Sequence, residues 1–135
     1  MAVTALHTFG WRMEQELQPK LESFLEQKLT KTVRRFDTID FVTPTHAVEL
    51  KARQGVDKYG LPVFSTTYPD WLLPACKVSN KSDRVQVYFY YFEGDRSLWV
   101  LHKADVDWNT IKCQVPFWHT QLHYYVPANL WQRII

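Results

Sequence analysis

Apolar and polar positions first follow a helical period. From residue 9 to residue 29, apolar side chains recur at steps of three and four: Phe9, Met13, Leu17, Leu21, Phe24 and Leu25. Thr8 is suited to cap the start of such a helix. Pro19 cannot donate a backbone hydrogen bond, so it either kinks the run or starts a second helix. We therefore expect helical structure over residues 9–29.

The period then changes to two. Residues 33–42 and 47–53 alternate between apolar and polar side chains and flank a turn that contains Pro44, which is typical of a β-hairpin. If the turn is centred on Pro44 and the residue after it, Phe41 pairs with Val48. Because strand side chains alternate between faces, this register predicts one apolar face and one polar face.

The polar face of the hairpin carries the most informative residues. Asp40 lies opposite Glu49, and Lys51 shares their face. Two carboxylates that face each other across a strand pair repel, by about 4 kcal/mol at ~4 Å in an effective dielectric near 20. A divalent cation reverses this effect, and Mg²⁺ binds a few carboxylate oxygens while keeping several waters. Asp37 is the rival acid, but it falls on the apolar face in this register.

The arrangement Asp40 … Glu49-Leu50-Lys51 resembles the active-site pattern of the PD-(D/E)xK nuclease superfamily. There the acidic pair lies on a hairpin and binds Mg²⁺, and the lysine helps to orient the attacking water. The resemblance implies that Asp40, Glu49 and Lys51 are catalytic. It also implies that Asp40, Glu49 and the Leu50 backbone carbonyl bind the metal. One departure is Ile39, which stands where the family name has a proline.

Many members of the superfamily place another acid near the metal from their first helix. Glu14 and Glu16 are the candidates here, because both flank the apolar stripe of the predicted helix. We prefer Glu16. For each of them singly, a solvated helix flank is the alternative.

The resemblance also implies a fold and an activity. It covers residues 9–103 in element order and is sharp only at Asp40, Glu49 and Lys51. The implied fold is a single α/β domain over residues 1–135. Its restriction-endonuclease-like core is a central mixed sheet of four to five strands flanked by helices, and residues 104–135 form a C-terminal extension. The implied activity is endonucleolytic hydrolysis of DNA phosphodiester bonds with Mg²⁺, for which Mn²⁺ can substitute. Superfamily members of this size commonly act on branched, nicked or flapped DNA, in repair or recombination, and often as homodimers.

The same residues also have a simpler interpretation. Glu26-Gln27-Lys28 has the same Glu-x-Lys spacing in a helical segment, where it is most simply a solvated face. Glu49 and Lys51 would likewise be solvated on the outer face of a half-exposed antiparallel sheet. A shift of one residue in the turn would move Asp40 off their face. The alternative function is a non-catalytic nuclease-like fold that binds nucleic acid or a protein, and a third is a structural protein whose aromatic surface mediates assembly.

The rest of the chain predicts further strands with loops between them. Nearly every side chain from residue 84 to residue 92 is β-branched or aromatic, which indicates a central strand covered on both faces. The other expected elements are a loop at 54–60, an ambiguous segment at 61–73 with a helix start at Pro69, a short helical turn at 75–82, a strand at 97–102, an edge strand at 121–126 and a terminal helical turn at 129–135.

Composition and charge narrow the class of partner. With 135 residues and 16% aromatic content, the chain is long enough for one well-packed domain. A net charge of +2 is too small to prove a polyanion partner, but basic residues cluster on either side of the hairpin and further along. The candidates for contact with nucleic acid are Arg34, Arg35, Arg53, Lys58, Lys77 and Lys81. Tyr59 and Tyr68 are candidates for stacking on bases, whereas Trp71 is expected in the core. Scattered solvated charge is the alternative.

Cysteine usage and hydropathy point to the inside of the cell. Cys76 and Cys113 form no disulfide pattern, which fits a reducing compartment. No apolar stretch approaches the ~18 residues of a membrane span, and the N-terminus lacks a secretory signal. We therefore expect a cytoplasmic or nuclear protein that is not secreted. Cys113, His119 and His123 are too few for a closed zinc site, and an extended strand would separate the two imidazoles.

Overall fold

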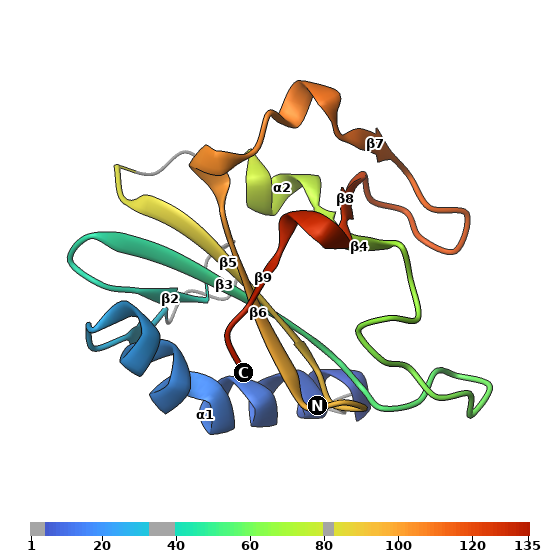
Figure 1. Ribbon diagram of the computed structural model, residues 1–135, viewed down its shortest axis with the longest axis horizontal. Coiled ribbons are helices and arrows are strands. Elements are labelled where there is room, and N and C mark those ends of the chain that lie inside the picture. The colour runs from blue at the N-terminus through green and yellow to red at the C-terminus, as the bar shows by residue number, and fades with distance from the viewer. Residues whose placement is uncertain (1–4, 33–39, 80–82) are drawn as a thin grey trace.

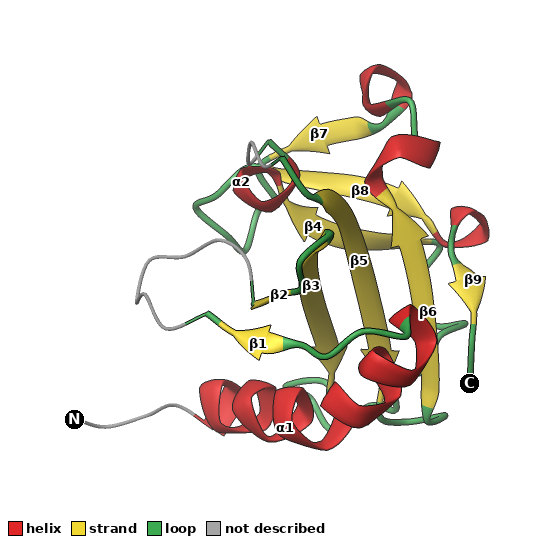
Figure 2. Cartoon of the chain, turned by 90° about the vertical axis from the view of Figure 1, so that its left-hand side faces the viewer, coloured by secondary structure: helices red, strands yellow, loops and turns green. Residues whose placement is uncertain are grey.

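The computed structural model describes residues 5–32, 40–79 and 83–135 and arranges them in three layers (Figures 1 and 2). A mixed sheet forms the middle layer, a long helix lies against one face, and a smaller sheet with a short helix lies against the other. The expected α/β class is therefore confirmed. No helix in the described part of the chain has the length and apolar character needed to cross a membrane.

The long helix, α1 (Ala5–Leu25), buries the predicted apolar stripe. Met13, Leu17 and Leu21 are buried against the middle sheet because residues four apart lie on one face of a helix. The helix starts at Ala5, so the prediction of Thr8 as its cap is wrong. Pro19 lies inside α1 on its exposed side and does not divide it into two helices.

The middle sheet has six strands among the described residues, in the order β1-β2-β3-β5-β6-β9. β3 and β5 pair in parallel and the other neighbours pair antiparallel. The strands are β1 (Thr30–Lys31), β2 (Phe41–Val42), β3 (His46–Arg53), β5 (Val85–Phe92), β6 (Ser97–His102) and β9 (Gln132–Arg133). The expected number of four to five is exceeded because β9, from a segment predicted to be a helical turn, adds an edge strand beside β6.

The strand β5 lies in the centre of this sheet and separates two cores, as its composition predicted. Val87 and Phe89 face α1, whereas Tyr88 and Tyr90 face the opposite layer. In the parallel register of β3 with β5, Glu49 pairs with Tyr88 and Lys51 pairs with Tyr90. The polar face of β3 therefore points toward the second core.

A three-stranded sheet in the order β4-β8-β7 covers that second face. Its strands are β4 (Asp70–Pro74), β7 (Lys112–Gln114) and β8 (His123–Pro127). The prediction of a helix start at Pro69 is wrong, because Trp71 and Leu73 point into the core with the period of a strand. The prediction of an edge strand at 121–126 is also wrong, because β8 is paired on both sides.

The remaining helices in the described residues are short. α2 (Ala75–Val78) follows β4 directly and confirms the helical turn expected there. The 3-10 helices are η1 (Lys103–Asp105), η2 (Trp108–Thr110) and η3 (Ala128–Leu130). The expectation that helices flank the sheet thus holds for the face under α1, while a sheet and α2 together cover the other.

Candidate functional site

The predicted register of the hairpin is confirmed. Phe41 pairs with Val48, and the Asp40 N–H donates to the Val48 carbonyl at 3.1 Å. The Leu50 N–H donates to Asp40 Oδ2 at 2.9 Å, so the backbone of β3 holds this carboxyl beside Glu49. Ile39 and the rival acid Asp37 lie outside the described residues.

Glu49 and Lys51 are covered rather than solvated. The Glu49 side chain is only 13% exposed, because the polar face of β3 lies beneath α2 and the small sheet. Glu26 and Lys28, which have the same spacing, are exposed just after α1. The interpretation of Glu49 and Lys51 as a solvated sheet face is therefore wrong.

Two carboxyl groups, from Glu14 of α1 and Glu49 of β3, converge on Asp40. Its carboxyl is within hydrogen-bonding reach of both Glu49 and Glu14. Burial, and then the charge of Asp40, raise the pKa of Glu49 well above its ordinary value. Burial also raises the pKa of Glu14, against the opposing effect of its ion pair with Lys31. Asp40 therefore repels both Glu14 and Glu49, which are partly or fully buried.

Of the two glutamates proposed from the first helix, the structure brings Glu14 to Asp40. Glu16 lies on the exposed side of α1, where Arg12 Nε is 3.7 Å from its Oε1. The sequence offered a weak signal for this difference. Glu14 follows the buried Met13 directly, whereas Gln15 and Glu16 lie on the outer side of the helix.

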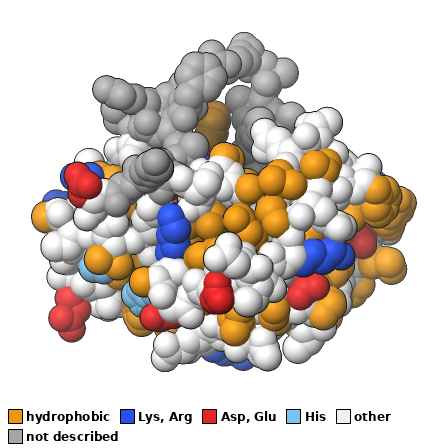
Figure 3. Space-filling view, turned by 90° about the horizontal axis from the view of Figure 1, so that it is seen from above, with side chains coloured by type: hydrophobic (Ala, Val, Ile, Leu, Met, Phe, Trp, Pro, Cys, Tyr) orange, Lys and Arg blue, Asp and Glu red, His pale blue; other side chains and the backbone are white. Residues whose placement is uncertain are grey.

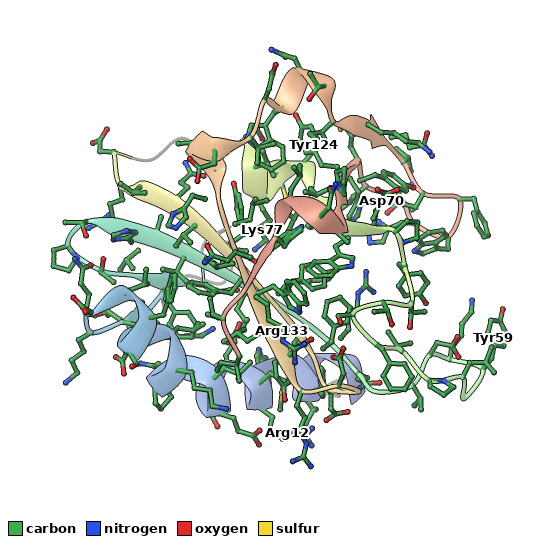
Figure 4. The ribbon with its side chains drawn as sticks, viewed as in Figure 1. Arg12, Tyr59, Asp70, Lys77, Tyr124 and Arg133 are labelled. Carbon is green, nitrogen blue, oxygen red and sulfur yellow. The ribbon has the colours of Figure 1, made fainter. Side chains whose placement is uncertain are left out.

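Lys77 reaches the same carboxyl cluster from α2, and Figure 4 shows it directed from that helix toward the middle sheet. Its Nζ lies 3.2 Å from Glu49 Oε1, and the two side chains are 20% and 13% exposed. Burial lowers the pKa of Lys77, but attraction to Glu49 and Asp40 outweighs burial and raises it overall. The second oxygen, Glu49 Oε2, is buried without a hydrogen-bond partner.

Lys51 has a different electrostatic environment on the same face of β3. Burial and then the charge of Arg53 lower the pKa of Lys51 to about 8, although Glu49 acts in the opposite direction. An amine with this pKa exchanges a proton readily near neutral pH. Lys51 is therefore able to donate a hydrogen bond, or to carry charge, next to the two carboxyl groups.

The structure brings two of the six basic residues proposed for nucleic-acid contact to this place. They are Lys77 and Arg53, whose Nε donates to the Tyr90 hydroxyl at 3.1 Å. Lys58 lies against the ring of Tyr59 on an exposed loop, which Figure 4 shows far from Lys77. The other three proposed residues lie outside the described part of the chain: Arg34, Arg35 and Lys81.

Comparisons with known proteins identify no relative of this chain. No family model, no curated protein and no solved structure matches the chain. What the site does is therefore inferred from its own residues.

The donor set suits a hard cation that keeps most of its water. Within residues 5–32, 40–79 and 83–135, no three His, Cys, Asp or Glu side chains are placed to enclose a metal ion. Mg²⁺ commonly takes only one or two carboxylates and several waters, so a pair such as Asp40 and Glu49 is sufficient for it. The unpartnered Glu49 Oε2 provides an oxygen for this purpose.

His119 and His123 were expected to be separated by an extended strand. Their ring centroids instead lie 4.6 Å apart.

Sequence reasoning did not identify two contacts of this site. Lys31 was considered only among the basic residues that lead into the hairpin, and its ion pair with Glu14 was not anticipated. His123 is buried at the start of β8, and burial lowers its pKa against the opposing effect of a hydrogen bond with the Gln121 backbone. The charges of His119, Lys51 and Arg53 lower this pKa further. Neither contact has a local sequence signal, because each depends on segments that are distant along the chain.

Proposed function

We propose that the protein is a metal-dependent nuclease of the PD-(D/E)xK type, with Asp40 and Glu49 as the metal ligands and DNA as the substrate. The observation that carries the proposal is the buried Glu49 Oε2, which lacks a hydrogen-bond partner and lies beside the Asp40 carboxyl. Burial of a carboxylate oxygen without a donor is costly, and a bound cation removes this cost. The order of α1, a hairpin, α2 and a parallel β5 also supports a restriction-endonuclease-like core.

Each side chain has a role in this proposal. Asp40 is fixed by the Leu50 N–H beside Glu49, whose Oε2 has no hydrogen-bond partner, so these two carboxyl groups would hold the metal ion together. When bound there, Mg²⁺ polarises the scissile phosphate and lowers the pKa of a water. Lys51 donates to that water or to the phosphate oxygens as charge builds on them. The Leu50 carbonyl and Glu14 are further candidate ligands, and Arg53 contributes positive charge to the substrate side.

A second candidate function is supported by Lys77. Its ammonium group already neutralises part of the Glu49 charge, so the cluster has an internal counter-ion. A nuclease-like fold that binds nucleic acid or a protein without catalysis would keep such a pair permanently. The two candidate functions differ in whether a metal ion is required.

The test is a cleavage assay on supercoiled, single-stranded and branched DNA with Mg²⁺, Mn²⁺ or EDTA. We expect cleavage by the wild type only with metal, and a loss of more than about 100-fold in Asp40→Asn and Glu49→Gln. Lys51→Met should lose cleavage while still binding DNA. Glu26→Gln is the matched control, because it changes an exposed glutamate with the same Glu-x-Lys spacing.

The outcomes separate the two functions. Cleavage by Glu49→Gln at the wild-type rate would refute the assigned site. Absence of cleavage by the wild type on every substrate, together with retained DNA binding, would favour the non-catalytic module.

Both cysteines, Cys76 and Cys113, are free and exposed, so the protein should be assayed under reducing conditions. We place the activity in the cytoplasm or nucleus, in keeping with these thiols.

A further inference from the structure

An aromatic pair is exposed on the loop between β7 and β8. This loop, residues 115–122, is named here the aromatic loop. Phe117 is 95% exposed and Trp118 is 58% exposed, and their rings pack edge to face with centroids 4.9 Å apart. The buried Pro116 anchors the loop, and its carbonyl accepts from the His119 N–H at 2.9 Å. Figure 3, which is seen from above, shows apolar side chains in separate groups with basic and acidic side chains between them. Two large rings held in water by an ordered turn indicate a binding surface.

The aromatic loop is hydrogen-bonded to the start of α2, the helix that carries Lys77. The Ala75 N–H, at the start of α2, donates to the Leu122 carbonyl at 2.9 Å. Lys77, which contacts Glu49, therefore lies two residues from the point where the loop is attached. In Figure 2 the loop and α2 lie on the same side of the molecule. The loop also ends at the buried His123, which is within electrostatic range of Lys51.

The charge around the aromatic loop favours an anionic partner. From residue 108 to residue 135 the sequence contains no Asp or Glu, and Lys112 lies on β7, the strand that leads into the loop. Phosphates would thus meet no side-chain carboxylate in this segment. Exposed rings combined with positive charge are the features that bind single strands, because every base has a face on which a ring can stack. In a duplex the base faces are covered by their neighbours.

We propose that Phe117 and Trp118 stack on unpaired bases of DNA whose phosphodiester bond lies at the Asp40 and Glu49 carboxyl groups. This inference rests on the proposed nuclease function and names its substrate class, which is DNA with a single-stranded segment next to the cleaved bond. A protein partner would require roughly 800 Å² on each side, more than a pair of rings on one loop offers. Stable attachment to a membrane takes two signals, and this loop offers one.

The experiment measures binding separately from cleavage. The Glu49→Gln protein in EDTA is titrated into a fluorescein-labelled 30-nucleotide single strand, and in parallel into the blunt duplex of the same sequence. Phe117→Ala and Trp118→Ala are then introduced together into the Glu49→Gln protein. This variant should bind the single strand about tenfold more weakly than Glu49→Gln alone, which is within the range for loss of stacked bases. Duplex binding should change by less than about twofold.

A matched pair controls for the loss of exposed apolar surface. Trp11→Ala with Leu61→Ala removes side chains that are 55% and 61% exposed, on α1 and on the loop after β3. This double variant should bind the single strand as its parent does. A single strand with 2-aminopurine at successive positions should show quenching that depends on Phe117 and Trp118, because quenching requires a ring against the base.

Four results would overturn the inference. They are equal loss of single-strand and duplex binding, no loss of either, a change in the sedimentation coefficient of the aromatic-loop variant alone, and binding of that loop to anionic vesicles in preference to DNA. The proposed function can fail separately. If the wild type does not cleave but single-strand binding depends on the rings, the inference stands for a binding module. If the wild type cleaves and the loop variant binds and cleaves equally well, the inference alone fails.

Discussion

Lys77 and Glu49 form an ion pair of 3.2 Å between the crossover that follows β4 and the central strand β3. The two residues are distant along the chain, and both side chains are mostly shielded from water. Lys77 therefore holds one oxygen of Glu49 while the other has no partner. Any cation that binds Glu49 therefore binds next to the ammonium group of Lys77.

Removal of Lys77 should destabilise the protein through Glu49. In Lys77→Met the Glu49 carboxylate is left buried and unpaired, and we expect a loss of about 2 kcal/mol in the free energy of unfolding at pH 7.5. The loss should shrink as the pH falls, because Glu49 has a raised pKa and becomes neutral on protonation. Urea unfolding across pH 4.5–8 measures both effects.

The double variant Lys77→Met with Glu49→Gln checks the origin of that loss. Because no buried charge remains unpaired, most of the stability should return. Arg12→Gln removes two exposed ion pairs, with Glu16 and Glu93, and should cost less than about 1 kcal/mol. An equal cost of Lys77→Met with and without Glu49 would show that the ion pair is not responsible.

The burial of Lys51 predicts a stability profile in alkaline solution. Its pKa is about 8 in the folded protein and 10.5 ordinarily, so between these values the unfolded chain binds more protons. The contribution of Lys51 to stability is therefore fully present above pH 10.5 and is lost as the pH falls through 8. Relative to Lys51→Met, the wild type should gain at most about 3 kcal/mol between pH 7 and pH 10. Chemical unfolding at four pH values measures this gain, and a flat profile identical to that of the exposed Lys28→Met would contradict it.

Metal binding should raise the unfolding temperature through the carboxyl cluster. At a Mg²⁺ concentration 100 times the dissociation constant, the gain is about 2.7 kcal/mol if only the folded state binds. Asp40→Asn and Glu49→Gln should abolish the shift. Glu14→Gln should reduce it, whereas Glu16→Gln should leave it unchanged, because only Glu14 is within reach of Asp40. Thermal melts with and without Mg²⁺ test this, and a full shift in Glu49→Gln would place the metal elsewhere.

The small sheet should depend on Trp71. Its ring contacts those of Tyr90, Phe92, Trp99 and Trp131 between the two sheets. Trp71→Ala should therefore cost about 3–5 kcal/mol in urea unfolding. Trp11→Ala, which removes an exposed tryptophan from α1, should cost less than about 0.5 kcal/mol. Similar losses in the two variants would contradict the role of Trp71 as the main contact of the second core.

Local pattern was a good guide wherever a side chain's neighbours are close in sequence. The stripe in α1 and the Phe41–Val48 register follow from periods of 3.6 and 2. The central position of β5 follows from its nearly continuous run of β-branched and aromatic residues. Pattern failed at β4 and β8. Pro69 is a frequent first residue of helices, but burial of Trp71 and Leu73 against the main sheet favours a strand. β8 was predicted to lie at an edge, but β4 and β7, which both precede it along the chain, pair with its two sides.

The sequence by itself determined the placement of Asp40, Glu49 and Lys51 on one face of a hairpin, because alternation along a strand is a local property. Only the tertiary structure decided that this face is buried, since the crossover and the C-terminal strands must fold over it. The same packing selected Glu14 over Glu16 and brought Lys77 to Glu49. Burial changes the free energy of a charged group far more than the residues next to that group in the sequence do. The chemistry of these carboxyl groups therefore depends on contacts between distant segments.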